Sequence, residues 1–106
     1  MNNHLDINIL KEACLSGNVQ WTIHILEKMQ ERDVEPSDVI SCISTGTIIE
    51  LYPDAFPYPA CLVLGTTVKQ SFLHVVVGYG GGYIWIVTVY EPNEREWENG
   101  FTTRKR

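Results

Sequence analysis

The sequence lacks the residue patterns that bind metal ions or cross membranes. Its three cysteines, Cys14, Cys42 and Cys61, are far apart and form no CxxC or Cys/His ligand spacing. No run of 18 apolar residues is present, as a membrane-spanning helix would need, and residues 1–20 carry charges where a signal peptide would have its apolar core. We therefore expect a cytoplasmic protein with reduced cysteines, no metal, no cofactor and no membrane partner.

Basic residues are also scarce. The 106 residues include eight Lys and Arg against 13 Asp and Glu, for a net charge of −5, and a stand-alone nucleic-acid-binding domain usually carries a basic surface. The imbalance is uneven, because residues 1–60 have a net charge of −6 and residues 61–106 one of +1. The chain ends in the basic cluster Arg104, Lys105 and Arg106. The composition therefore allows a local basic patch on an otherwise acidic protein.

The chain shows helical periodicity before residue 46 and strand-like runs after it. Helices are expected over residues 6–16, 18–32 and 36–44. Strands are expected over residues 47–51, 60–66, 72–79 and 83–90. This order predicts a single α+β domain over residues 1–106, with the N-terminal helices packed on one face of a four-stranded antiparallel β-meander. Residues 1–17 form an extra N-terminal helix in this scheme, and residues 18–106 form the rest of the domain.

The last two predicted strands form a hairpin whose register assigns side chains to the two sheet faces. With Gly80–Gly82 as the loop, the expected cross-strand pairs are Tyr79–Tyr83, Val76–Ile86, His74–Thr88 and Phe72–Tyr90. The face expected to receive the helices carries Val75, Val77, Trp85 and Val87. The other face carries the polar side chains His74, Thr88 and Tyr90 among apolar ones.

The predicted helix over residues 18–32 carries a row of nitrogen-bearing side chains. Asn18 can cap its start, and His24, Lys28 and Arg32 recur at four-residue spacing, which places them on one side of a helix. The apolar side, expected to face the core, carries Ile23, Leu26 and Val19. Such a row can hold an anionic ligand, or it can form ordinary salt bridges such as Lys28–Glu31 and Arg32–Glu35.

Three further groups are candidate binding or catalytic residues, each with a plain structural alternative. His74, Thr88 and Tyr90 can form the sheet side of a cleft, or a cross-strand hydrogen bond and an aromatic pair. Tyr52 opens a proline-rich loop over residues 52–59 that can act as a recognition lip or can simply be well packed. Arg104 lies in the basic end of the chain, which can contact nucleic acid or remain a solvated tail.

Several segments in order resemble a known family. They are the stretch from His24 to Arg32 with Pro36 and Asp38-Val39, then Ile48-Ile49-Glu50-x-Tyr52-Pro53-Asp54, Pro57-Tyr58-Pro59-x-Cys61-Leu62-Val63-Leu64, Leu73-His74-Val75-Val76 and Val87-Thr88-Val89-Tyr90-x-Pro92. Over about residues 20–105 the chain resembles a bacterial family of small domains of unknown function. Its members often sit beside YgiT-type zinc-finger proteins, an arrangement similar to toxin–antitoxin pairs of the MqsR/MqsA kind.

The resemblance implies a RelE-like fold and a toxin-type, metal-independent endoribonuclease, with RNA as substrate and a zinc-finger antitoxin-like protein as partner. In this hypothesis His24 and His74 transfer protons, with Tyr90 as a substitute, while Lys28 and Arg32 balance phosphate charge. The second hypothesis is a non-catalytic interaction module. It would pair with the zinc-finger partner or with a second copy as a homo-oligomer. The two hypotheses differ in whether the row on the helix and the polar groups of the hairpin share one cleft.

Overall fold

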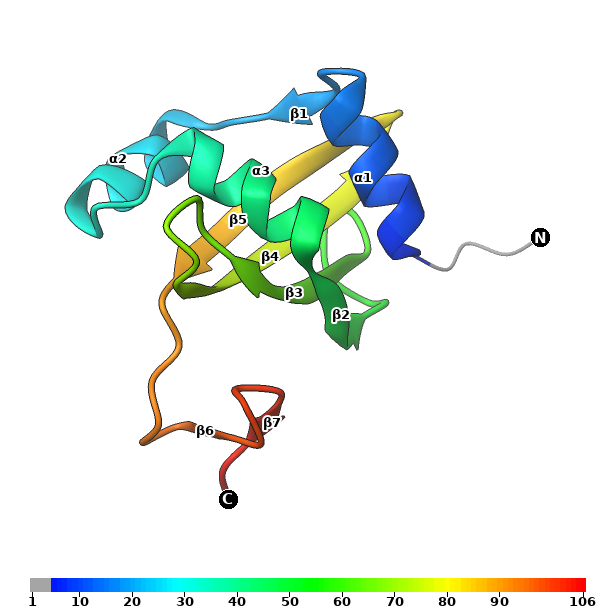
Figure 1. The fold of residues 1–106 in the computed structure, drawn as a ribbon. Coiled ribbons are helices and arrows are strands. Elements are labelled where there is room, and N and C mark those ends of the chain that lie inside the picture. The colour runs from blue at the N-terminus through cyan, green and yellow to red at the C-terminus, as the bar shows by residue number, and fades with distance from the viewer. Residues whose placement is uncertain (1–4) are drawn as a thin grey trace.

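Three helices cover one face of a five-stranded sheet in the computed structural model, which describes residues 5–106 (Figure 1). The helices are α1 (Ile7–Leu15), α2 (Ile23–Glu31) and α3 (Pro36–Thr45). The sheet strands are β1 (Val19–Gln20), β2 (Thr47–Tyr52), β3 (Ala60–Thr66), β4 (Phe72–Gly80) and β5 (Tyr83–Tyr90). A separate two-stranded hairpin contains β6 (Trp97–Glu98) and β7 (Thr103–Arg104). The predicted α+β class is therefore confirmed.

The sheet differs from the expected four-stranded antiparallel one. Its strand order is β1-β5-β4-β3-β2, and the additional strand β1 runs parallel to β5, which makes the sheet mixed. Residues 19–20 were expected to be helical, but they pair with Ile84 and Trp85. The Asn18 carbonyl also accepts a hydrogen bond from the Ile84 amide at 3.0 Å. Backbone pairing with β5 therefore replaces the first turn of the predicted helix.

Helix α2 consequently begins at Ile23, and its cap is Thr22 rather than Asn18. The Thr22 hydroxyl oxygen accepts from the Ile25 amide at 3.1 Å, which satisfies one of the unpaired donors of the first turn. The buried residues of α2 are Ile25 and Met29, four positions apart. The expectation that Ile23 and Leu26 face the core is wrong, because these side chains are 77% and 41% exposed.

The β4–β5 hairpin has a shorter loop and a different register from those expected. Gly80 pairs with Tyr83, so only Gly81 and Gly82 form the turn, both with positive φ. A loop one residue shorter exchanges the two faces of β5. Ile84 and Ile86 therefore point to the helices in place of Trp85 and Val87.

A β-bulge at Val76/Val77 then restores the expected alternation further along the hairpin. The observed pairs are His74–Tyr90 and Val76–Thr88, so the four expected cross-strand pairs are wrong. The expected sharing of one face by His74, Thr88 and Tyr90 is nevertheless confirmed, because the bulge adds one residue to β5. These three side chains lie on the face away from the helices, which we call the open face.

The hydrophobic core lies between the helices and the sheet. It contains Leu10 and Ala13 of α1, Ile25 and Met29 of α2, Val39, Cys42 and Ile43 of α3, and strand residues from β3, β4 and β5. A Cβ at Gly65 of β3 would overlap the backbone of Cys42, so α3 can approach β3 closely because this residue is glycine. All three cysteines are free thiols, and burial raises the pKa of Cys42 and Cys61 to about 12.

Candidate functional site

The row on α2 lies beside the uncovered edge of β5. Strand β1 pairs only with Ile84 and Trp85, so among residues 5–106 the rest of β5 has no strand partner on that side, and α2 packs against β5. The resulting pocket, with a volume of about 110 Å³, is lined by His24, Ile25, Lys28, Arg32, Val87 and Thr88. We call it the α2–β5 pocket. It brings four of the predicted site residues together, since Thr88 of the sheet joins the three nitrogen-bearing side chains.

Within this pocket the three nitrogen-bearing side chains differ in how they are held. The Arg32 guanidinium donates to the Val89 carbonyl at 2.7 Å, which ties the end of α2 to β5 and orients the guanidinium group. The Lys28 ammonium lies 3.5 Å from a Glu31 carboxylate oxygen, with the Lys28 side chain partly exposed and the Glu31 side chain largely exposed. His24 is exposed in the first turn of α2. The pocket therefore combines one fixed cation, one loosely paired cation and one accessible imidazole.

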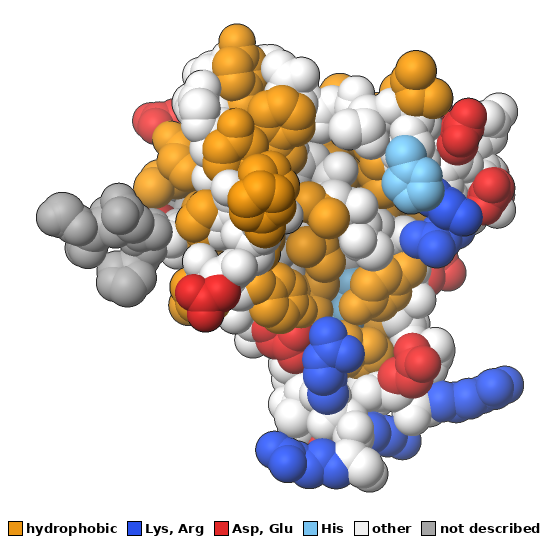
Figure 2. Space-filling model, turned by 180° about the vertical axis from the view of Figure 1, so that it is seen from behind, with side chains coloured by type: hydrophobic (Ala, Val, Ile, Leu, Met, Phe, Trp, Pro, Cys, Tyr) orange, Lys and Arg blue, Asp and Glu red, His pale blue; other side chains and the backbone are white. Residues whose placement is uncertain are grey.

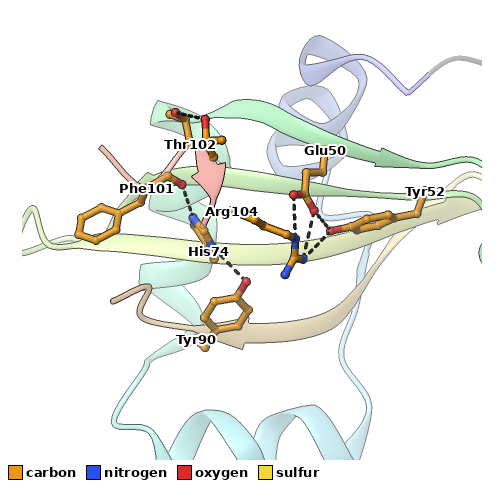
Figure 3. A network of polar contacts seen from close by, with 8 residues as sticks. Glu50, Tyr52, His74, Tyr90, Phe101, Thr102 and Arg104 are labelled. Atoms are coloured by element: carbon orange, nitrogen blue, oxygen red, sulfur yellow. Dashed lines mark hydrogen bonds and ion pairs between the residues drawn. The ribbon is translucent and has the colours of Figure 1, made fainter. Parts of the chain in front are cut away.

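His74 lies apart from this pocket and is completely buried. Its Nε2 is 2.9 Å from the Phe101 carbonyl oxygen and its Nδ1 is 3.1 Å from the Tyr90 hydroxyl (Figure 3). A carbonyl oxygen only accepts, so Nε2 carries the proton and Nδ1 accepts from Tyr90. The Trp97 ring packs edge-on against the imidazole at 4.4 Å between centroids. Burial lowers the pKa of His74, despite the hydrogen bond to Phe101.

Arg104 and Tyr52 meet at Glu50, a residue that sequence reasoning missed. Arg104 donates to both Glu50 carboxylate oxygens, at 2.9 and 3.2 Å, and Tyr52 donates its hydroxyl proton to the same carboxylate (Figure 3). Burial acts to raise the pKa of Glu50, but the hydrogen bonds from Arg104 and Tyr52 leave it lowered. The Arg104 guanidinium also lies 4.7 Å from the centre of the Trp97 ring. The signal available from the sequence was the placement of Glu50 and Tyr52 two residues apart on one strand.

These contacts hold the C-terminal hairpin, residues 97–104, against part of the open face. Tyr90, His74, Tyr52 and Arg104 therefore serve the packing of this hairpin, and they are brought together with one another rather than with His24. The three side chains of the α2 row and Thr88 remain as the accessible group. The predicted site residues thus fall into two clusters, one between α2 and the edge of β5 and one at the C-terminal hairpin.

A second and larger pocket occupies the remainder of the open face. It has a volume of about 510 Å³ and is lined by Thr22, Tyr52, Ala55, Phe56, Pro57, Tyr58, Ala60, Val76, Gly78, Trp85, Ile86 and Val87. We call it the aromatic pocket. Hydrophobic side chains gather on this face, and a histidine with Lys and Arg side chains lies at its edge (Figure 2). Sequence reasoning missed this pocket, because it placed Trp85 and Val87 on the helix face.

Among residues 5–106, no group of three His, Cys, Asp or Glu side chains is placed to hold a metal ion. Within the same residues, no helix is long and apolar enough to cross a membrane.

The fold and the pockets define the protein as a mixed α+β domain with helices on one sheet face, an aromatic pocket on the other face and a second pocket between α2 and the edge of β5. A sequence model of the family described as "domain of unknown function (DUF4258)" matches residues 21–91, so the chain belongs to this family. The matched range contains α2, α3 and strands β2 to β5. No curated protein and no solved structure matches the chain significantly.

Proposed function

We propose that the protein is a metal-independent endoribonuclease that acts at the α2–β5 pocket. The observation that carries the proposal is that His24, Lys28, Arg32 and Thr88 line one accessible pocket. The pocket offers an imidazole for proton transfer and two cations for a phosphate group. As part of this proposal, the protein acts as a toxin similar to RelE and MqsR and is paired with a zinc-finger antitoxin-like protein.

The contacts of the pocket residues suggest a division of roles. His24 takes the proton from a ribose 2′-hydroxyl, and that oxygen attacks the adjacent phosphorus. The bond from phosphorus to the 5′ oxygen breaks, and Lys28 donates a proton to the leaving oxygen. The products are a 2′,3′-cyclic phosphate and a free 5′-hydroxyl, and proton exchange with solvent restores His24 and Lys28. Arg32, oriented by its bond to the Val89 carbonyl, stabilises the charge that develops on the phosphoryl oxygens.

His74 and Tyr90 are assigned a positioning role rather than a catalytic one. The imidazole of His74 is buried and both of its nitrogens are engaged, so it has no free nitrogen to offer a substrate. Tyr90 donates its hydroxyl proton to His74 Nδ1, so this hydroxyl is also engaged. Proton transfer therefore falls to His24 and Lys28, because the Arg32 guanidinium stays charged and is held by the Val89 carbonyl.

The test is cleavage of a short single-stranded RNA in the presence of EDTA. His24→Ala is expected to slow cleavage by roughly 10²- to 10⁴-fold, the usual contribution of a general base. Lys28→Arg keeps the charge but donates a proton poorly, so we expect it to retain RNA binding and lose rate. Gln30→Ala, an exposed change on the same helix, is the matched control. Cleavage that needs a metal ion, or that persists in His24→Ala, would overturn the proposal.

A non-catalytic interaction module is the second candidate, because α2 exposes two apolar side chains. Ile23 and Leu26 are 77% and 41% exposed, and their three-residue spacing places them on one side of the helix. A zinc-finger protein or a second copy of the chain could cover them. Absence of RNA cleavage by the wild-type protein, together with tight capture of such a partner, would favour this candidate.

A further inference from the structure

The aromatic pocket has flat, fixed walls of a kind that stacks on planar ligands. The rings of Trp85 and Tyr58 are stacked with centroids 5.8 Å apart and planes 26° from parallel. The Trp85 indole nitrogen donates to the Gly80 carbonyl at 3.2 Å, which fixes the ring orientation. At the rim Phe56 is 96% exposed. These aromatic groups form a preorganised surface that the hydrophobic core between the helices and the sheet does not use.

The floor of the pocket is open because the sheet carries small residues there. Gly78 pairs with Ala60 on one side and with Trp85 on the other, and neither Gly78 nor Ala60 has a side chain that reaches far above the sheet. A larger residue at Gly78 would occupy the space in front of Trp85. The volume of about 510 Å³ falls within the roughly 300–1,000 Å³ typical of small-ligand pockets.

The aromatic pocket and the α2–β5 pocket are neighbours that meet at Val87. Val87 lines both of them, while Thr22 lines the first and His24 the second, two residues further along the chain. An apolar, aromatic cavity therefore lies directly beside a row of cations. A ligand that fills both must join a flat ring to an anion, as a nucleotide unit does.

We propose that the aromatic pocket binds the nucleobase next to the phosphate bound in the α2–β5 pocket. The substrate is then single-stranded RNA, bound through stacking of this base on the aromatic side chains. This inference rests on the proposed function. A base within a duplex is already paired and stacked, and single-stranded RNA offers unstacked bases to aromatic side chains. The protein has a net charge of −5, which favours a ligand held by one stacked base and one or two phosphates over a long nucleic acid held by its backbone.

The lining also indicates how the base is read. The Tyr52 hydroxyl is committed to Glu50, and the other lining groups are mostly apolar, so few hydrogen-bonding groups face the edge of a base. Recognition then depends on stacking area, which is larger for purines than for pyrimidines. We expect a purine preference with little discrimination between adenine and guanine.

The test measures binding of a five-nucleotide RNA with a single 2′-deoxy substitution at the scissile position, so that cleavage plays no part. Replacing the base beside that position by an abasic site is expected to weaken binding to the wild type by roughly 5- to 150-fold. Trp85→Leu is expected to weaken binding of the intact RNA by a similar factor and to bind the abasic RNA no worse than the intact one. Phe56→Ala is a second variant of the pocket. Because Phe56 is an exposed rim residue, its removal should leave the fold intact. Trp21→Phe is the control, since it changes a tryptophan outside the pocket.

Equal affinity of the wild type for intact and abasic RNA would overturn the inference, as would unchanged binding by both Trp85→Leu and Phe56→Ala. Variants that lose self-association or partner capture without losing RNA affinity would assign the pocket to a protein partner and also overturn it. The proposed function fails separately, through the cleavage assay with His24→Ala. Loss of cleavage in His24→Ala with no effect of the abasic site would refute the stacking site alone.

Discussion

His74 connects the C-terminal hairpin to the sheet through Nε2, which bonds to the Phe101 carbonyl, while Nδ1 bonds to Tyr90 of the neighbouring strand β5. The hydrogen bonds to Phe101 and Tyr90 satisfy a fully buried imidazole, which would otherwise be costly to bury. In the neutral ring, which the lowered pKa of His74 favours, Nε2 donates to Phe101 and Nδ1 accepts from Tyr90. Protonation of His74 would place a charge in a buried site and replace an acceptor by a donor. The residue is therefore a point at which the fold responds to pH.

We predict that the protein loses stability through His74 as the pH falls. Burial lowers the pKa of His74 in the folded state, so the unfolded chain takes up the proton first, beginning near its ordinary pKa of about 6.5. The free energy of unfolding should fall from there down through the lowered pKa of the folded state. Urea denaturation at pH 7.5, 6.0 and 5.0 measures this. Below that range Glu50, whose pKa is also lowered, adds a further loss.

His74→Gln should be less stable at pH 7.5 but should lose less stability between pH 7.5 and 5.0 than the wild type, because an amide does not titrate. The matched control is His24→Gln, which makes the same chemical change on the exposed surface of α2. A pH dependence that disappears in His24→Gln and persists in His74→Gln would contradict this assignment.

At the scale of elements, local sequence patterns correctly predicted the helices and strands whose boundaries depend on local interactions. Residues 36–44 were predicted as a helix, and α3 spans Pro36–Thr45, since proline suits a first helical turn. Residues 60–66 were predicted as a strand and form β3. The start of α2 was missed because β5, more than 60 residues away, offers backbone partners to Val19 and Gln20. No local pattern reveals such a distant partner.

The candidate site was predictable to a similar extent. The spacing of His24, Lys28 and Arg32 correctly predicted one polar row on a helix, because this depends only on helical geometry. Its pairing with Thr88 depends on how α2 packs on β5, and the aromatic pocket depends on a turn of two glycines instead of three. A one-residue difference in that loop reverses which side chains of β5 face the helices. The row of nitrogen-bearing side chains was therefore predictable from the sequence, whereas the shape of the pocket was not.

For the C-terminal hairpin we predict that Arg104→Ala loosens β6 and β7 without unfolding the sheet. The change removes both hydrogen bonds to Glu50 and the contact with the Trp97 ring. The Arg104 side chain is 59% exposed, so the loss should be about 1 kcal/mol. Amide exchange at Lys105, which donates to the Glu96 carbonyl at 2.8 Å, should become roughly fivefold faster. Exchange in β3 should not change.

Lys105→Ala is the control for this hairpin experiment, since it removes the same charge from the neighbouring residue. Equal acceleration in the two variants would show that net charge, rather than the contacts of Arg104 with Glu50 and Trp97, governs the stability of the hairpin.

At the scale of the whole molecule, the folded unit extends beyond the range that defines the family. The family match covers residues 21–91, but Leu10 and Ala13 of α1 lie in the core, and β1 completes one edge of the sheet. On the other side, Trp97 is 3% exposed and packs on His74. Segments at both ends therefore cover apolar surface that belongs to the matched range.

We predict that a fragment of residues 21–91 is far less stable than one of residues 5–106. Loss of the Leu10 side chain alone should cost about 2–5 kcal/mol, a large part of the roughly 5–15 kcal/mol that stabilises a typical domain. The fragment also lacks β1 and the Trp97 contact, so His74 and the end of β5 become exposed. Urea denaturation followed by circular dichroism should show no cooperative transition for residues 21–91. The urea midpoints should be lowered for fragments of residues 21–106 and 5–91. These two deletions separate the contribution of the N-terminal segment from that of the C-terminal segment. A fragment of residues 21–91 with the midpoint of the longer chain would mean that the core closes without its terminal segments.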